Sequence, residues 1–294
     1  MQTPKIYIGT AGWSYQNWLR SFYPKSQSDK FNWLEYYAQF FNAVEINKSY
    51  YSYIPNDNIK SWIDKVEKKN DFLFTLKLNQ DFTHKKAFKK EQIEAVKENL
   101  KTLQDSNRLG GLLIQFPYSF ELNKQNATHV KTLVEIFDEY EKYIEIRHKS
   151  WLIDRFTDFL AKNKSSLCTI DQPEIGESVQ FKPNKAGDLY LRFHGRNEKA
   201  WKESFDNYGK AQTYDEKSER YDYLYTPGEL LEIERAIKEA LDTVKKVYII
   251  MNNHPNGQAI ANAFELLHLL NDRMKVAIPQ TTLQAYPRLT KIAL

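Results

Sequence analysis

The sequence predicts a single α/β barrel that occupies residues 1–294. Short apolar runs alternate along the chain with segments of helical periodicity, as in parallel strands joined by helical crossovers. Eight such runs occur, and this number favours a closed (β/α)8 barrel of the TIM type over an open sheet. The loops that follow the runs are longer than those that precede them, which is typical of a barrel with one functional end.

The predicted elements follow one another in strict alternation. Strands are expected at 5–11, 43–49, 72–78, 110–116, 143–148, 166–171, 188–194 and 246–252. Helices are expected at 33–41, 56–69, 88–104, 127–140, 153–163, 228–242 and 258–270. The sixth helix is predicted to be weak or missing, because residues 174–187 include Pro183 and Gly187 and leave little room for it. Long loops at 12–32, 79–87 and 195–227 mark the carboxyl ends of the strands as the functional end.

Composition narrows the class of protein. The formal net charge is +4, from 42 basic and 38 acidic residues, which is far from the concentrated positive charge of a dedicated nucleic-acid-binding protein. The single cysteine, Cys168, excludes an intrachain disulfide framework and suits a reducing compartment. The sequence contains neither a segment that resembles a signal peptide nor the roughly 20 apolar residues that a membrane span needs. The expected location is the cytoplasm, without membrane association.

The stretch YIEIRHKSW at 143–151 places charged residues inside a strand. Glu145 and Arg147 alternate with Ile144 and Ile146, so the two kinds of side chain lie on opposite faces. If the all-apolar face packs on the helices, the polar face lines the barrel. The same rule predicts further inward-facing side chains near the carboxyl ends of other strands: Glu45, Asn47, Thr75, Lys77, Gln115, Asp171, Arg192, His194 and Asn252.

The charged members of this set balance in sign. Unpaired charges inside a barrel are costly, so the three acids and three bases are expected to form one hydrogen-bonded network: Glu45, Glu145, Asp171, Lys77, Arg147 and Arg192. One interpretation is a structural lattice that fixes the strand register. The other is a ligand cavity, which is favoured because the charges gather at one end of the barrel.

Loop residues extend the candidate site beyond the strands. Histidines are expected there at 84, 148, 194 and 254, together with Arg196. Aromatic residues of the same loops could stack on sugar rings or bases, or pack the loops down; among them Trp13 and Trp151 are taken as ligand-binding candidates. No metal site is predicted, because the sequence lacks a compact ligand motif and three cations share the site; a divalent metal stays an alternative. No cofactor is predicted either, since nucleotide-binding glycine motifs are absent.

Several ordered phrases resemble the YecE-like family, the domain of unknown function numbered seventy-two: IGTAGWSYQNW, LEYYAQFFNAVEIN, FLFTLKLNQDFTH, LGGLLIQFP, IEIRHKSW, YLRFHGR, YDYLY and MNNHPNGQAIANA. The resemblance runs from Ile6 to about Leu270 and implies a single TIM-type barrel domain. It implies no reaction. The chain departs mildly from the family pattern, with KSYY in place of a Thr-Phe-Tyr motif and MNN in place of Phe-Asn-Asn.

These residues are compatible with three functions. The first is an enzyme for a small phosphorylated or carboxylated, sugar-like ligand, catalysing isomerisation, epimerisation or hydrolysis. In it Glu45, Glu145 and His194 transfer protons. The ligand is bound by Lys77, Gln115, Arg147, Asp171, Arg192, Arg196, Asn252, Trp13 and Trp151. The second is a nucleic-acid-binding or nucleic-acid-processing protein that uses loop lysines beside His84, and the third is a non-catalytic ligand-binding barrel.

Residues 197–226 form the longest link between a strand and a helix. The segment is polar yet rich in aromatic residues, which is unusual for a solvated linker. We expect it to fold over the carboxyl end of the barrel and to bring Trp201 near Arg192, His194 and Arg196. It would then act as a lid that excludes water or as a static cover.

Overall fold

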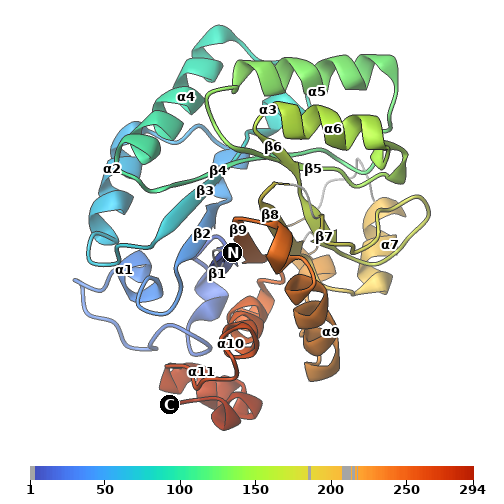
Figure 1. Ribbon diagram of the computed structural model, residues 1–294. Helices are drawn as coiled ribbons and strands as arrows, with labels where there is room; N and C mark the ends of the chain where they lie inside the picture. Colours follow the sequence, from blue (N-terminus) through green and yellow to red (C-terminus); the bar gives the residue numbers. More distant parts are fainter. Residues whose placement is uncertain (1–3, 185–186, 207–212, 214–215, 217) are drawn as a thin grey trace.

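Parallel strands form a barrel with helices around it (Figure 1). The computed structural model describes residues 4–184, 187–206, 213, 216 and 218–294. The strands are β1 (Lys5–Ala11), β2 (Ala43–Ile46), β3 (Leu73–Lys77), β4 (Leu109–Gln115), β5 (Lys142–Glu145), β6 (Ser165–Leu167), β7 (Thr169–Asp171), β8 (Leu189–Phe193) and β9 (Lys246–Met251). Their order in the sheet is β6-β5-β4-β3-β2-β1-β9-β8-β7, and every pair is parallel.

The predicted sixth strand divides in two at Cys168. Its first half, β6, pairs with β5, and its second half, β7, pairs with β8. The Cys168 backbone N–H donates to the Ile144 carbonyl, 2.9 Å away, so the chain stays attached to β5 up to the break. Both ends of the strand order therefore belong to one stretch of chain, and this stretch closes the barrel. The predicted barrel is confirmed.

The helices cover the outside of the strands. They are α1 (Trp33–Tyr37), α2 (Asn56–Lys65), α3 (Gln80–Thr83), α4 (Lys90–Asp105), α5 (Lys124–Ile136), α6 (Asp154–Lys162), α7 (Glu198–Asp206), α9 (Pro227–Lys238), α10 (Gln258–Leu270) and α11 (Gln280–Ala285). The sequence pattern did not predict α3, α7 or α11. Between β7 and β8, residues 172–184 and 187–188 contain no helix, which confirms the missing sixth helix for the part that is described.

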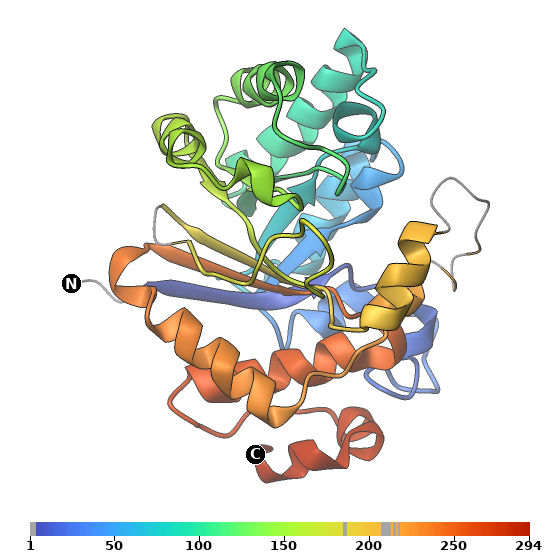
Figure 2. The same ribbon diagram turned by 90° about the vertical axis from the view of Figure 1, so that its right-hand side faces the viewer.

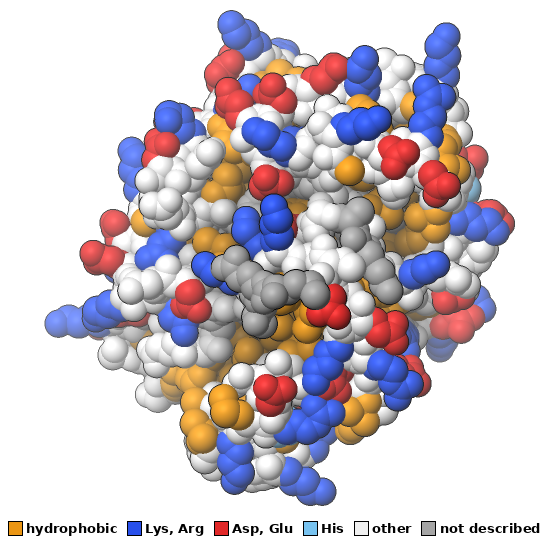
Figure 3. Space-filling view, in the orientation of Figure 1, with side chains coloured by type: hydrophobic (Ala, Val, Ile, Leu, Met, Phe, Trp, Pro, Cys, Tyr) orange, Lys and Arg blue, Asp and Glu red, His pale blue; other side chains and the backbone are white. Residues whose placement is uncertain are grey.

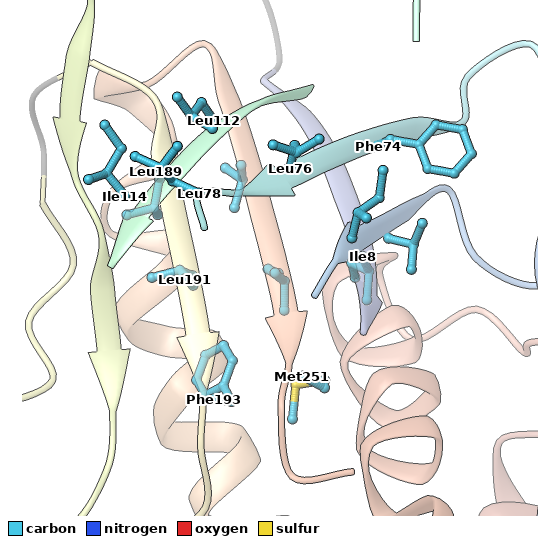
Figure 4. Close-up of a cluster of buried hydrophobic side chains, with 14 of the residues drawn as sticks. Ile8, Phe74, Leu76, Leu78, Leu112, Ile114, Leu189, Leu191, Phe193 and Met251 are labelled. Carbon is cyan, nitrogen blue, oxygen red and sulfur yellow. The ribbon is translucent and has the colours of Figure 1, made fainter. Parts of the chain in front are cut away.

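Two apolar clusters separate the outside of the barrel from its inside. The larger lies between strands and helices and includes the outward side chains in Figure 4, among them Phe74, Leu76 and Leu191. The smaller fills the interior and contains Tyr7, Ala11, Ala43, Leu113, Tyr143, Cys168, Ile170, Tyr190, Tyr248 and Ile250. Tyrosine rings stack there, with 4.4 Å between the centroids of Tyr143 and Tyr190. This apolar floor leaves the charged interior residues at the carboxyl end.

The carboxyl ends of the strands form what we call the mouth. Figure 2 shows α7 at this end, opposite the N-terminus. Helix α9 begins close to it with a capping box, in which the Thr226 hydroxyl accepts from the Glu229 backbone N–H and the Glu229 carboxylate accepts from the Thr226 backbone N–H. This cap fixes the point at which the long link after β8 ends. None of the described helices has the length and apolar character that a membrane span requires.

Candidate functional site

An arginine with two carboxylates forms the centre of the barrel interior. Arg192 on β8 binds Glu45 on β2 through one edge of its guanidinium, with Nε to Oε2 at 2.9 Å and Nη2 to Oε1 at 2.8 Å. Its Nη1 donates to Glu145 Oε2 at the end of β5. Arg192 is 1% exposed, and neither carboxylate is exposed at all. The inward orientation predicted for all three residues is confirmed.

A second arginine extends the cluster toward the mouth. Arg147 Nε donates to Glu145 Oε1 at 2.8 Å. Burial raises the pKa of Glu145, but the charges of Arg192 and Arg147 outweigh it and hold that pKa well below its usual range. Glu145 is therefore ionised at neutral pH and has no proton to donate. The geometry assigns it to hold the two guanidinium groups in place.

Glu45 is similarly occupied. Besides Arg192, it accepts a hydrogen bond from the Tyr190 hydroxyl at 2.9 Å, and Tyr190 in turn lies 2.8 Å from the Thr75 hydroxyl. These partners reach Glu45 from β3 and β8, and all of them are buried. The catalytic role expected for Glu45 would require it to leave this network.

His194 is buried and neutral. Asn252 Nδ2 lies 2.8 Å from His194 Nδ1, and Arg147 Nη2 lies 3.4 Å from His194 Nε2. Nε2 faces Glu145 Oε1 at 3.5 Å. Burial lowers the pKa of His194 to about 3, against the opposing effect of Glu145. Both nitrogens of His194 are engaged inside the cluster, so its expected role in proton transfer to a ligand has no open atom to use.

Lys77 differs from the other charged residues of the interior. It ends β3, is 8% exposed, and places its ammonium 4.3 Å from the centroid of the Tyr50 ring. Within the described part of the chain, its Nζ has neither an ion pair with a carboxylate nor a hydrogen bond. Burial lowers its pKa to about 7; Arg192 and Arg147 add to this effect, and Glu45 and Glu145 oppose it.

The inward orientation predicted for Asp171 is wrong. Cys168 and Ile170 belong to the interior cluster, so the alternate residue Asp171 faces the other side of the strand. The prediction assumed that apolar side chains point to the helices. That assumption fails here because the floor of the barrel is itself apolar. The interior consequently has two carboxylates, Glu45 and Glu145, against the three cations Lys77, Arg147 and Arg192, and the predicted balance of charge does not hold.

Asp171 instead forms part of a separate polar group with Arg196. The two are joined in a bidentate ion pair, with Arg196 Nη2 to Asp171 Oδ2 at 2.7 Å and Nε to Oδ1 at 3.0 Å. The Tyr225 hydroxyl donates to Asp171 at 2.6 Å, and Arg196 also pairs with Glu229 at 3.2 Å. This group, Asp171, Arg196, Tyr225 and Glu229, is called the anchor cluster. It ties both ends of the 197–226 link to β7, which leaves Arg196 occupied away from the central arginine.

The link after β8 covers the mouth, as expected. Residues 197–206 and 218–226 are called the flap; Tyr208 and Tyr214, which contribute to the aromatic content of the link, lie outside the described residues. Trp201 of α7 is 3% exposed, and its ring centroid lies 6.2 Å from that of His194. The Arg147 guanidinium lies 5.5 Å from the centroid of Trp201. The flap therefore packs directly on the charged cluster.

Two flap residues bring further chemistry to the mouth, and sequence reasoning gave neither a role. The Arg220 guanidinium lies 4.9 Å from the Tyr221 ring centroid and 5.3 Å from that of Trp201. Its Nε is buried and has no hydrogen-bond partner among the described residues. Burial raises the pKa of Tyr221, but Arg220, Arg147 and Arg192 outweigh it and lower that pKa. The aromatic content of the link was a signal for the flap but not for the position of Arg220.

The remaining predicted ligand-binding residues have structural contacts. Gln115 is buried and donates to the Phe116 carbonyl at 2.9 Å. Trp151 is 1% exposed, stacks on Phe120 and donates to its carbonyl at 2.7 Å. Trp13 packs edge-on against Trp62, with 5.0 Å between ring centroids. These contacts favour the packing role that was the alternative for the rim aromatics.

Other described parts of the chain are weaker candidates for a functional site than the mouth. No group of three or more His, Cys, Asp or Glu side chains suited to a metal ion occurs among residues 4–184, 187–206, 213, 216 and 218–294. A cavity of about 370 Å³ is lined by Tyr7, Lys164 and Lys246, near the amino ends of the strands. Basic and acidic side chains are interspersed over the face in Figure 3, with no single-sign stripe. The charged cluster at the mouth is therefore the strongest candidate site.

The fold and the site together define a (β/α)8-type barrel with a buried charged cluster at the carboxyl ends of its strands and a flap over that cluster. The chain belongs to the family described as "Protein of unknown function DUF72", whose model matches residues 7–286. The YecE-like resemblance is thereby confirmed. The chain is also 29% identical over 279 residues to the UPF0759 protein YunF of Bacillus subtilis (strain 168), covering 90% of this chain and 95% of that protein.

Solved structures show the same fold. A DUF72 family protein from Thermotoga maritima MSB8 is similar with a TM-score of 0.77 and 30% identity, over 91% of this chain and 99% of that chain. A DUF72 family protein from Enterococcus faecalis V583 is similar with a TM-score of 0.75 and 26% identity, over 90% of this chain and 95% of that chain. These relatives establish the family and the barrel fold of this chain. Their names do not state a reaction.

Proposed function

We propose that this protein is an enzyme that binds a small phosphorylated or carboxylated ligand at the mouth, between Lys77 and Arg147 of the barrel and Arg220 of the flap. The observation that carries the proposal is the excess of buried positive charge. Both interior carboxylates are engaged by Arg192, and one of them also holds Arg147. Lys77 has no carboxylate partner within the described residues.

An anion would complete this arrangement. A buried cation without a counter-charge is unfavourable, and a phosphate or carboxylate oxygen supplies both the charge and the hydrogen-bond acceptors. Arg220 offers a buried Nε that lacks a partner among described residues. Arg147 uses Nε for Glu145 and places Nη2 3.4 Å from His194 Nε2, which leaves Nη1 for a ligand. The flap and the barrel would thus each contribute one arginine to the same ligand. The Trp201 and Tyr50 rings supply flat apolar walls of the kind that pack on sugar rings.

Tyr221 is the proposed proton donor. Its lowered pKa, together with its place beside Arg220, suits a phenol that must release a proton and exist briefly as phenolate. Glu45 and Glu145 then act as positioning residues that keep the arginines ordered. This division of roles suits isomerisation, epimerisation or hydrolysis of a sugar-like anion.

The nucleic-acid alternative has less support. Lys85 pairs with Asp81 at 2.9 Å, and Lys86 donates to Asn126 at 2.7 Å, so two lysines of the basic run have partners on the protein. Single-stranded DNA binding that weakens steeply with salt would favour this alternative over an enclosed anion site.

The anion site is tested by calorimetry with inorganic phosphate and pyrophosphate. We expect Arg220→Gln and Lys77→Met each to weaken binding at least about tenfold, because a charge-assisted hydrogen bond contributes roughly 1.5–3 kcal/mol. Arg235→Gln is the matched control, since Arg235 is exposed on α9. Unchanged affinity in both mouth variants, or equal loss in the control, would contradict the proposal. A search for turnover of sugar phosphates by the wild type then separates an enzyme from a non-catalytic binding protein.

A further inference from the structure

We propose that Lys77 is a covalent nucleophile that forms an imine with the carbonyl group of an anionic oxo compound, a 2-oxo acid or a phosphorylated ketone or aldehyde. The inference rests on the proposed function, because Arg147 and Arg220 would hold the anionic group of the same molecule. It adds the substrate class and a covalent step.

The geometry around Lys77 is that of a reactive amine. Its side chain leaves the carboxyl end of β3 toward the interior and rests on the Tyr50 ring, which keeps one side of the ammonium apolar. Within the described residues no acceptor binds its Nζ. Structural lysines in this barrel look different. Lys142 is fully buried, and its Nζ donates to the carbonyls of Phe137 and Tyr140 at 3.1 and 2.8 Å.

The electrostatics of the site agree with this geometry. An amine must be neutral to attack a carbonyl, and enzymes achieve this by burying a lysine or by placing it near other cations. Lys77 has both conditions, since burial and the charges of Arg192 and Arg147 lower its pKa to about 7. A pKa lowered this far allows the neutral amine to exist near neutral pH.

Imine formation at Lys77 passes through a carbinolamine. The neutral Lys77 nitrogen bonds to the carbonyl carbon, and one amine proton passes to the former carbonyl oxygen, which gives a carbinolamine. The Tyr221 hydroxyl then protonates that oxygen, the carbon–oxygen bond breaks, and water leaves. The nitrogen keeps one proton in a positively charged iminium, and solvent reprotonates the Tyr221 phenolate. No redox partner is needed.

An iminium at this position would extend what the site can do. It withdraws electrons from the neighbouring carbon, so a proton or a carbon substituent there can be removed more readily. Arg147 and Arg220, whose charges lower the pKa of Tyr221, would stabilise its transient phenolate as well as the anionic group of the substrate. Isomerisation at a carbon next to a carbonyl is a reaction of this kind.

Reductive trapping tests the imine. The full-length protein is incubated at pH 7 with sodium cyanoborohydride and either glyoxylate or pyruvate, and modified lysines are mapped by mass spectrometry. We expect Lys77 to be modified at least about tenfold faster than exposed Lys89 or buried Lys142. Acetaldehyde, which lacks the anionic group, should not show this preference. Tyr221→Phe should slow trapping at Lys77 without changing that at Lys89.

Two variants of Lys77 control for misfolding. Phosphate binding separates the imine proposal from the anion-site proposal. Lys77→Arg keeps the positive charge but cannot form the imine, and Lys77→Met removes the charge; both should lose the adduct while circular dichroism shows a folded barrel. If glyoxylate and pyruvate modify Lys77 no faster than Lys89, the imine is refuted. Phosphate binding that is weakened in Arg220→Gln would then still support the anion site. If phosphate binding is also absent from the wild type, the proposed function fails with it.

Discussion

Arg192→Met is expected to destabilise the protein by about 3–5 kcal/mol or to prevent folding, because removing one partner of a buried ion pair strands the other charge. Here the substitution leaves Glu45 without a cation and removes one of the two arginines that bind Glu145. Neither carboxylate is exposed to solvent. The free energy of unfolding measured in urea gives the size of the effect. Arg220→Met is the matched control, because that residue sits on the flap and binds no described carboxylate.

A second substitution checks the cause. Adding Glu45→Gln to Arg192→Met removes one stranded carboxylate, so the double variant should recover part of the lost stability. A single variant within 1 kcal/mol of the wild type, or a double variant that is less stable than the single one, would show that the ion pairs are not what holds the mouth together.

Lys77→Met is expected to do the opposite and stabilise the barrel near neutral pH. The folded-state pKa of Lys77 is about 7, below its ordinary value of 10.5. Between these values the unfolded chain binds a proton that the folded protein does not, so the contribution of Lys77 to stability rises with pH across this range. The full cost of the buried charge is present below about pH 7 and is gone above about pH 10.5. It corresponds to roughly 5 kcal/mol at most.

Urea denaturation at pH 6.5 and 9.5 distinguishes the possible roles of Lys77. We expect a gain of several kcal/mol for Lys77→Met at pH 6.5 and a smaller gain at pH 9.5, with no change for the exposed control Lys89→Met. A variant that is more stable but no longer binds phosphate would mark Lys77 as a residue kept for function at the expense of stability. Destabilisation at pH 6.5 would favour the structural lattice over the ligand site.

Much of the barrel follows from the order of apolar runs and helical segments. Period-two alternation placed Glu45, Glu145, Arg147 and Arg192 inside, because each sits opposite large outward side chains such as Ile144 and Ile146. The same rule failed at Asp171, because the apolar side chains of β7 point to the apolar floor of the barrel and Asp171 points outward to the anchor cluster. Alternation shows that the two faces of a strand differ, but it does not show which face points into the barrel.

The sequence could not predict which charged residues of the site pair with each other and which one has no partner. Which cation lacks a carboxylate depends on side-chain packing across four strands, so Lys77 could not be told apart from Arg192 by its position in the alternating pattern. Arg220 and Tyr221 reach the mouth through a fold of the flap that no periodic pattern encodes. Sequence reasoning could predict that the link covers the mouth because its aromatic residues needed a surface to pack on.

The divided closing strand also bears on how the polypeptide assembles during synthesis. As the chain emerges, β6 can pair with β5 at once, but β7 must wait for β8, and β1 must wait for β9. An unfinished chain therefore has two unpaired sheet edges, and they meet only after residue 251 is available. Cys168 sits at the junction between β6 and β7 and is 3% exposed once the barrel is closed. The last pairings to form are therefore those of β9 with β1 and β8, whereas the one thiol of the protein marks the junction at which the closing stretch passes from β5 to β8. Its reaction with a thiol reagent would report whether that junction is open.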